Sequence, residues 1–458
     1  MAERNATLET AIETLTTQKK YPALRDVLVT MNPADIAAMF GDLEERTLPL
    51  LFRLLPKDIA AETFAELDPE LQELLIRGFS DSELKDVVDE LYVDDAVDLV
   101  EEMPANVVKR ILKQADAETR KLINDILKYP EDSAGSIMTT EFIDLRPTMT
   151  VADAIKNIRR NGSDSETINT CYVTDEGKHL IGIVSIRAIL LAEEDAVLND
   201  IMEDNVISVS TLADQEEATA MISKYNFTVM PVVDQEDRLV GIITVDDAMD
   251  VMEDEATEDI EIMGGTTPVD TAYLRTSVFQ FWRARIPWLM LLMIGATFTG
   301  MILDHYENAL ARLTVLTMFI PMLMDTGGNS GSQCSVTVIR ALSLGDIEFS
   351  DILSVIWKEI RVAVLCGVSL AAVSFLKIML IDRMLLGNDD ISLLVALTVC
   401  VTMALVVLVA KLIGCTLPML ADKLGLDPAV MSSPFITTIV DALSLLIYFA
   451  IASSLLGT

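Results

Sequence analysis

The sequence predicts a multidomain membrane protein: an all-α superhelical N domain, a duplicated α/β region and an all-α transmembrane domain of five helices. Three observations predict this order. Apolar residues recur at helical spacing up to about Tyr129, a strand and helix pattern occurs twice between about Ser136 and Asp259, and five long apolar segments follow. The chain has 458 residues, more than one hydrophobic core usually organises, so at least two domains are expected.

Residues 1–130 are expected to form the helical N domain. Pro33, Pro56 and Pro104 each open a helical segment, and Ser80 with Asp81 opens another, which gives a repeat of roughly 23 to 25 residues. One short helix pair is too small to bury its own apolar face, so stacked pairs should form a small superhelix. An ordinary helical bundle is the alternative.

The duplicated region is expected at residues 131–200 and 201–260. One copy contains INTCYVTDEGKHLIGIVSIRAIL and the other FTVMPVVDQEDRLVGIITVDDAM, each a strand, a turn, a strand that begins near a glycine, and a helix. The two copies resemble a tandem pair of CBS modules, whose pattern G-h-h-[ST]-x-x-D is matched by Gly241, Thr244 and Asp247. The resemblance implies ATP as a possible ligand of the CBS pair. The first copy has Ala188 in place of the acid that commonly holds the ribose.

Residues 261–285 are expected to form an amphipathic connecting helix at the membrane surface, because one side of the segment is polar and the other aromatic. Residues 286–458 then supply the transmembrane domain. The predicted spans are Ile286–Leu303, Leu313–Leu342, Val355–Leu380, Leu393–Leu417 and Pro434–Leu456. Basic residues gather at one end of these spans, so the N-terminal domains should be cytosolic and the C-terminus outside. The opening MAERNATLETAIETL lacks the basic and apolar parts of a cleaved signal, which agrees with that orientation.

Composition narrows the function. Up to Asp270 the chain carries 23 basic and 58 acidic residues, of 34 and 71 in all. A part so acidic repels nucleic acid and attracts small cations, although any single carboxylate is more often a solvated surface group. The five cysteines lack C-x-x-C spacing and are expected to be reduced, packed thiols. Only His179 and His305 are present, which argues against a histidine-based metal centre. No phosphate-binding G-x-x-x-x-G-K-[ST] loop or H-E-x-x-H helix occurs, so we expect no enzyme.

The second apolar segment contains PMLMDTGGNSGSQ, Pro321 to Gln333, which is unusual for a spanning helix. Proline and glycines release backbone polar groups, which survive in lipid only where they line protein or water. We therefore expect a broken helix whose carbonyls, together with Asp325, Asn329 and Gln333, line a pore. A glycine-rich seam for helix packing is the alternative.

This segment resembles the second spanning helix of the MgtE magnesium channels, which carries P-x-h-x-x-x-G-G-N-x-G-x-Q, and the order of the parts agrees over essentially the whole chain. The run Pro434 to Asp441 is similar to the family's fifth helix. The resemblance implies a Mg²⁺-selective channel, a homodimer in the cell (inner) membrane, with Mg²⁺ both permeant and regulatory. It places Asp441, Asn329, Gly328 and Thr437 at the pore. A carboxylate in the middle of an apolar span independently favours a water-filled path at Asp441.

The resemblance further implies that intracellular Mg²⁺ closes the channel by bridging acids of the cytosolic domains and the connector. Acids spaced four apart on a helix repel one another unless a cation lies between them. The candidate regulatory ligands are Asp94, Asp95, Asp98, Glu216, Asp247, Asp250, Glu255, Glu258, Asp259 and Asp427. Asn226 stands where another acid is expected. Two other functions remain open: a chloride channel or osmolyte transporter with CBS modules, and a coupled transporter in which Asp325 or Asp441 carries a proton.

Overall fold

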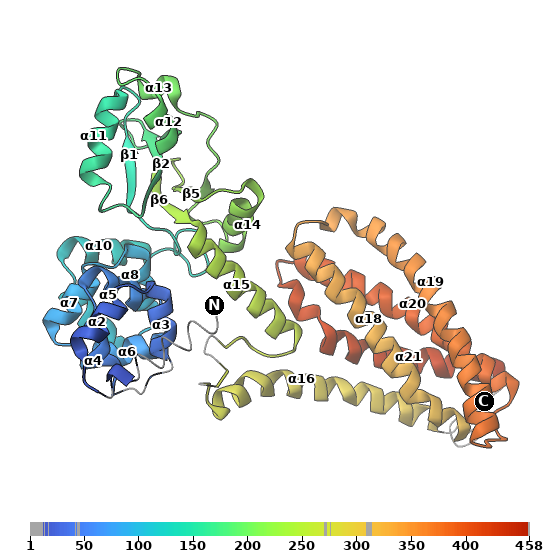
Figure 1. Ribbon diagram of the computed structural model, residues 1–458. Helices are drawn as coiled ribbons and strands as arrows, with labels where there is room; N and C mark the ends of the chain where they lie inside the picture. The colour runs from blue at the N-terminus through green and yellow to red at the C-terminus, as the bar shows by residue number, and fades with distance from the viewer. Residues whose placement is uncertain are drawn as a thin grey trace. The chain divides into compact units, whose positions relative to one another are not determined.

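The computed structural model describes residue 12 and residues 14–16, 18–41, 43, 46–269, 273–274, 276–307 and 314–456. Leu313, the predicted start of the second span, lies outside these residues. The chain divides into two compact units, Met1–Glu253 and Asp254–Thr458. Short helices and two small sheets make up the first unit, and long helices make up the second (Figure 1).

The N domain is a stack of short helices, and the predicted segment openings are confirmed. Proline or serine stands at or just before the first helical residue in each case, where a missing N–H or a side-chain cap suits a helix start. Alternate helices pack on one another in sequence, α3 on α5, α5 on α7 and α7 on α9. The helices are α2 (Tyr21–Leu28), α3 (Pro33–Gly41), α4 (Leu48–Phe52), α5 (Lys57–Ala65), α6 (Pro69–Gly78), α7 (Asp81–Val88), α8 (Val93–Glu102), α9 (Ala105–Gln114) and α10 (Ala117–Ile126).

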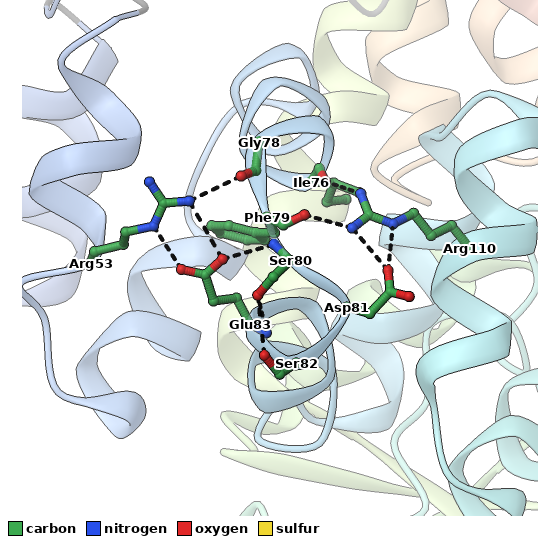
Figure 2. Close-up of polar contacts among 9 residues, drawn as sticks. All are labelled: Arg53, Ile76, Gly78, Phe79, Ser80, Asp81, Ser82, Glu83 and Arg110. Carbon is green, nitrogen blue, oxygen red and sulfur yellow. Dashed lines mark hydrogen bonds and ion pairs between the residues drawn. The ribbon is translucent and has the colours of Figure 1, made fainter.

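Two arginines hold the turn between α6 and α7 (Figure 2). Arg53, just after α4, donates from Nη2 to the Gly78 carbonyl at 3.0 Å. Arg110 on α9 donates to the carbonyls of Ile76 and Phe79, at 2.5 and 2.6 Å. Carbonyls at the end of a helix have no donor in their own helix. Arg53 and Arg110, which come from neighbouring helix pairs, therefore supply donors that the end of α6 lacks.

The duplicated region forms two sheets of identical topology. Each has a central strand that pairs in parallel with the strand before it and antiparallel with the strand after it. The first module has β1 (Phe142–Leu145), α11 (Val151–Asn161), β2 (Thr167–Thr174), β3 (Leu180–Ser185) and α12 (Ile186–Leu191). After α13 (Leu198–Ile201), the second has β4 (Val209–Ser210), α14 (Gln215–Tyr225), β5 (Val229–Val233), β6 (Leu239–Thr244) and α15 (Val245–Met263).

The two modules interlock at the glycines of their shared motif. A Cβ atom at Gly241 would lie 2.5 Å from the Met138 Sδ, and one at Gly182 would lie 2.6 Å from the Met202 Sδ. The residue after Met138, Thr139, bridges to β6 of the second module. The glycines are therefore needed because the segment that precedes one module crosses the sheet of the other.

The second unit consists of long helices packed side by side. α18 packs against α20 and α21, α19 against α20, and α16 against α21. Short 3₁₀ turns and one π-helical segment, Ile378–Leu385, join or extend them. The helices are α16 (Val278–His305), α18 (Ile320–Ser343), α19 (Ile352–Lys377), α20 (Leu393–Lys423) and α21 (Ser433–Leu456).

By length and composition, four segments of the described chain could cross a membrane: Val278–His305, Phe349–Leu385, Leu393–Lys423 and Pro428–Leu456. These correspond to four of the five predicted spans. The remaining one, the predicted second span, corresponds to α18, a 24-residue helix with the glycine-rich polar run in its first half. That run explains why hydropathy alone does not single it out.

Two expectations about local structure are wrong. The second span is not broken, because α18 is continuous from Ile320 to Ser343, after a 3₁₀ turn at Thr314–Phe319. The connector at 261–285 is not one separate helix either. Its first residues end α15, residues 264–269 are not helical, and α16 begins at Val278 with a Ser277 and Gln280 capping box. A good N-cap starts a new helix there, and nothing interrupts it before the membrane segment.

Candidate functional site

Three glycines of α18 bring it into close contact with its neighbours. A Cβ atom at Gly327 would lie 2.6 Å from a Val406 methyl group on α20, and one at Gly331 would lie 2.8 Å from an Ile436 methyl group on α21. Gly328 faces Thr437 in the same way, at 2.8 Å. The glycines thus form a helix-packing seam, the alternative stated above, and this packing keeps α18 intact.

The opposite side of α18 carries polar groups. Asp325, Asn329 and Gln333 follow one another at intervals of four residues, so they lie on one helix face. All three are exposed in the single chain. The packing seam and this polar stripe are therefore separate faces of one helix.

Asp441 lies in the middle of α21 and is half-buried. Its Oδ1 is covered, and no group of the described chain hydrogen-bonds to it. The carboxylate of Asp325 on α18 is close enough to repel its charge. Two acids from two helices that share an apolar environment are costly unless water or a cation reaches them.

Thr437 and Gly328 meet, but Thr437 is already engaged. Its Oγ1 donates to the Ser433 carbonyl at 2.7 Å and lies 3.4 Å from the Ser332 Oγ. The hydroxyl of Ser433 is in turn 3.0 Å from the Ser332 Oγ. Together these groups form a small hydroxyl cluster between α18 and α21, with oxygens that suit a hydrated cation.

In the first unit, three of the predicted regulatory acids come together. Asp94 and Asp95 on α8 lie near Asp247 at the start of α15. Burial, and then the charge of Asp247, raise the pKa of Asp94 well above its usual value and that of Asp95 to about 7. Asp247 itself accepts from the Thr244 hydroxyl at 2.5 Å, while its own pKa is raised by burial. The helical domain therefore meets the second module through repelling carboxylates.

Sequence reasoning missed two further acids at this contact, Glu141 and Glu166. Glu141 accepts from the backbone N–H of Val93, at the first turn of α8, at 3.0 Å. The Oε2 of Glu166 is buried, with no hydrogen-bond partner among the described residues. Burial, followed by the charge of Asp247, raises the pKa of Glu166 to about 8. Each acid stands just before a strand, and those strands pair in parallel at their first residues. An acid directly before each of two strands that pair in parallel was the sequence signal that could have predicted this contact.

Other predicted regulatory acids of the first unit lie on the same or neighbouring helices. Asp98 is exposed on α8, where Asp95 and Asp247 add to the negative potential. Glu216 is exposed in the first turn of α14, and Asp250 is exposed on α15. Asn226 ends α14 in the left-handed conformation with φ of 54°, which asparagine tolerates better than most residues. This backbone conformation explains why asparagine stands at position 226, where an acid was expected.

In the second unit, Asp259 near the end of α15 faces Asp427. Burial, and then the charge of Asp427, raise the pKa of Asp259, and Arg340 on α18 opposes this. Asp427 also accepts from the Ala429 N–H at 2.7 Å and so begins a 3₁₀ turn before α21. Glu255 and Glu258 lie on α15 beside Asp259. An acid at the end of α15 and an acid just before α21, the helix that carries Asp441, therefore lie close enough to repel each other.

Glu359 on α19 forms an ion pair with Lys411 on α20, with 3.6 Å between Nζ and Oε2. Both side chains are largely covered, at 15% and 8% exposed. The ion pair compensates the charge of Glu359, although the Glu359 Oε2 has no hydrogen-bond partner among the described residues.

Carboxylate, amide and hydroxyl oxygens are the donors that Mg²⁺ prefers. Within the described ranges, no three His, Cys, Asp or Glu side chains stand ready as a metal-binding group. The acids that do converge repel one another, and a divalent cation between them would relieve that repulsion.

Comparisons with known proteins cover nearly the whole chain. The family model for the MgtE divalent cation transporter matches residues 320–451, and that for the MgtE intracellular N domain matches residues 31–132. The CBS domain model matches residues 134–195 and 198–254.

Whole-length relatives agree. The magnesium transporter MgtE of Thermus thermophilus is 38% identical over 438 residues, 95% of each chain. That of Bacillus subtilis is 32% identical over 435 residues, 95% of this chain and 94% of the relative.

Two solved structures match the cytosolic part. One is the cytosolic domain of the Mg²⁺ channel MgtE in complex with ATP, at 36% identity and a TM-score of 0.51, covering 53% of this chain and 99% of that one. The other is the soluble part of a magnesium transporter, at 29% identity and a TM-score of 0.52, covering 55% and 99%. With its N domain, its CBS pair and its transmembrane helices all matched, this chain belongs to the MgtE family of magnesium transporters.

Proposed function

We propose that this protein is a homodimeric, Mg²⁺-selective channel for magnesium uptake that closes when intracellular Mg²⁺ binds its cytosolic acids. The observation that carries the proposal is the polar stripe Asp325, Asn329 and Gln333 on α18, together with Asp441 on α21. Lipid cannot satisfy such groups, so they require protein or water beside them.

A second copy of the chain would cover the polar stripe and shield it from lipid. The stripe is exposed in one copy, and two copies that face each other across it would enclose a water-filled path. Asp441 then contributes one carboxylate per subunit, with the Asn329 amide as a neutral oxygen, while Gly328 lets the Thr437 side chain approach α18 closely. Few charges and many neutral donors suit Mg²⁺, which keeps most of its water and must be released again.

Closure is a matter of charge. Without Mg²⁺ the acids of α8, Glu166 and Asp247 repel one another, and so do Asp259 and Asp427. Mg²⁺ at these places removes the repulsion, holds the helical domain on the CBS pair, and holds the end of α15 near the start of α21. Moving a gate from 1% to 99% closed takes about 5.5 kcal/mol, which several weak sites supply together.

The proposed domain limits are 1–130 for the helical N domain, 131–200 and 201–260 for the two CBS modules, 261–285 for the connecting segment and 286–458 for the transmembrane domain. The N-terminal domains are cytosolic and the C-terminus is outside, as the placement of basic residues favours. ATP binding to the CBS pair is proposed because a similar cytosolic domain was solved with ATP.

Single-channel recording from reconstituted protein in excised patches tests the proposal. Mg²⁺ is the only permeant cation outside and is titrated on the cytosolic face. Unitary currents that disappear as cytosolic Mg²⁺ rises through the millimolar range are expected. Vesicles that accumulate Mg²⁺ without any unitary current would instead establish a carrier, coupled through Asp441.

A further inference from the structure

Two buried thiols meet where α18 crosses α20. Cys334 on α18 is 2% exposed and Cys415 on α20 is fully buried. They share an apolar cluster with Val338 and Met419, and each thiol lies close enough to the other to affect its electrostatics. Neither the proposed ion path nor the proposed sensor uses them.

The backbones of the two helices nearly touch at this crossing. A Cβ atom at Gly414 would lie 2.4 Å from the Gly331 carbonyl oxygen and 3.1 Å from the Cys334 Cβ. A disulfide needs Cα atoms within about 4.4–6.8 Å, closer than most helix pairs approach. Contact through glycines is the kind of crossing that allows such a bond.

An ion pair adjoins the thiols. Lys411 lies one helical turn before Cys415 on α20, and the Cys334 Sγ donates to the Lys411 carbonyl at 3.4 Å. The Lys411 side chain pairs with Glu359 on α19, so a pair of charged groups borders the otherwise apolar cluster that holds the thiols.

We propose that Cys334 and Cys415 are an oxidant-sensitive pair that forms an intramolecular disulfide and thereby latches α18 to α20. The oxidant is a small uncharged peroxide, because uncharged reagents enter an apolar packed region at less cost than charged ones. One thiolate attacks a peroxide oxygen and becomes a sulfenic acid, and a proton completes the first water. The second thiol attacks the sulfenic sulfur, the S–S bond forms and a second water leaves. Two thiols are oxidised and one hydrogen peroxide is reduced.

The consequence for transport rests on the function proposed above. α18 carries the polar stripe, and its Gly331 touches both α20 and α21. A covalent bond at this crossing holds α18 in one position relative to α20. We expect Mg²⁺ influx to fall on oxidation and to return on reduction.

A full-length variant with Cys171→Ser, Cys366→Ser and Cys400→Ser keeps only the pair. It is reconstituted in vesicles, treated with hydrogen peroxide, and then unfolded and labelled with a maleimide that adds visible mass. Two labels before oxidation, none after it and two again after dithiothreitol are expected, with a linked peptide that joins positions 334 and 415 in mass spectrometry.

Influx of Mg²⁺ is measured on the same vesicles. A fall of about fivefold that dithiothreitol reverses is expected, and Cys334→Ser or Cys415→Ala in the same background should abolish that response. Two labels that persist after oxidation, or a linked peptide with other residues, overturn the pair. A disulfide that leaves influx unchanged overturns the latch. If no vesicle shows influx even when reduced, the proposed transport fails, while the label count still decides the disulfide.

Discussion

Gly328 on α18 faces Thr437 on α21 so closely that a Cβ atom at position 328 would lie 2.8 Å from the Thr437 Cγ2. Thr437 cannot turn away freely, since its hydroxyl is bonded to the Ser433 carbonyl. We expect Gly328→Ala to force α18 and α21 apart, to cost about 1–3 kcal/mol of stability and to lower Mg²⁺ flux. Thermal unfolding in detergent and vesicle influx measure both effects.

Gly300→Ala on α16 is the matched control, because nothing lies within 4 Å of a Cβ atom there. It should be neutral or slightly stabilising, as alanine is the better helix former. Adding Thr437→Ser to Gly328→Ala removes the clashing methyl group and should restore part of the loss. Equal effects of the two glycine substitutions would contradict a tight seam at Gly328.

Asp441→Asn should reduce Mg²⁺ influx by about tenfold or more, because the ion path loses its central carboxylate while the shape is kept. Asp304→Asn serves as control, since Asp304 is exposed at the end of α16. Influx into vesicles at matched protein density measures both. Normal influx through the Asp441→Asn protein would remove Asp441 from the ion path.

The contact between the N domain and the CBS pair should weaken as pH rises in the absence of divalent cations. The raised pKa values of Asp95, about 7, and Glu166, about 8, lie above those of the unfolded chain, 3.8 and 4.5. The folded contact therefore holds extra protons between about pH 4 and pH 8 and loses stability across that range. Hydrogen exchange of α8 in the full chain should be faster at pH 8 than at pH 6, after correction for intrinsic rates.

Mg²⁺ in excess should abolish that pH difference, and Glu166→Gln should reduce it. Glu193→Gln, an exposed acid of the first module, should leave it as it is. A contact equally protected at both pH values without Mg²⁺ would mean that these carboxylates do not repel one another.

Arg110→Ala should loosen the turn between α6 and α7. The Phe79 carbonyl loses its donor, and the Ile76 carbonyl keeps only the long bond from the Phe79 N–H at 3.4 Å. This costs about 1–2 kcal/mol, so amides of this turn should exchange about tenfold faster. Lys57→Ala removes only an exposed pair with Asp86 and should leave exchange unchanged. If both variants behave alike, the arginine is a surface group and not a cap.

Asp259→Asn should raise the cytosolic Mg²⁺ concentration that closes the channel. The substitution removes one of the two acids that face each other at the end of α15, so Mg²⁺ gains less by binding there. Glu253→Gln, an exposed acid on the same helix, is the control. The dose response of patch currents distinguishes them, and a curve that does not move would take Asp259 out of the sensor.

Local patterns in the sequence were enough for the overall organisation. Prolines and a serine mark the helix starts of the N domain, a repeated strand and helix pattern marks the two modules, and long apolar runs mark the spans. Each of these signals acts within a few residues of the chain, through a cap, a side-chain period or transfer into lipid.

Only the tertiary structure decided the course of α18, which the sequence predicts to be broken. Its glycines release no backbone groups, because Val406, Thr437 and Ile436 fill the space beside them and the helix stays hydrogen-bonded. The isolated pattern could not reveal this, since helix propensity is weaker than packing by neighbouring helices.

The convergence of acids likewise depended on the fold. Glu141 and Glu166 are 25 positions apart, and they meet because the strands that follow them pair in parallel from Phe142 and Thr167. Lys411 and Glu359, and the thiols of Cys334 and Cys415, meet across helix pairs in the same way. Residue types and spacing therefore determined which chemistry this protein carries. Packing of distant segments determined which of those groups face one another, because contact energies act between neighbours in space and not along the chain.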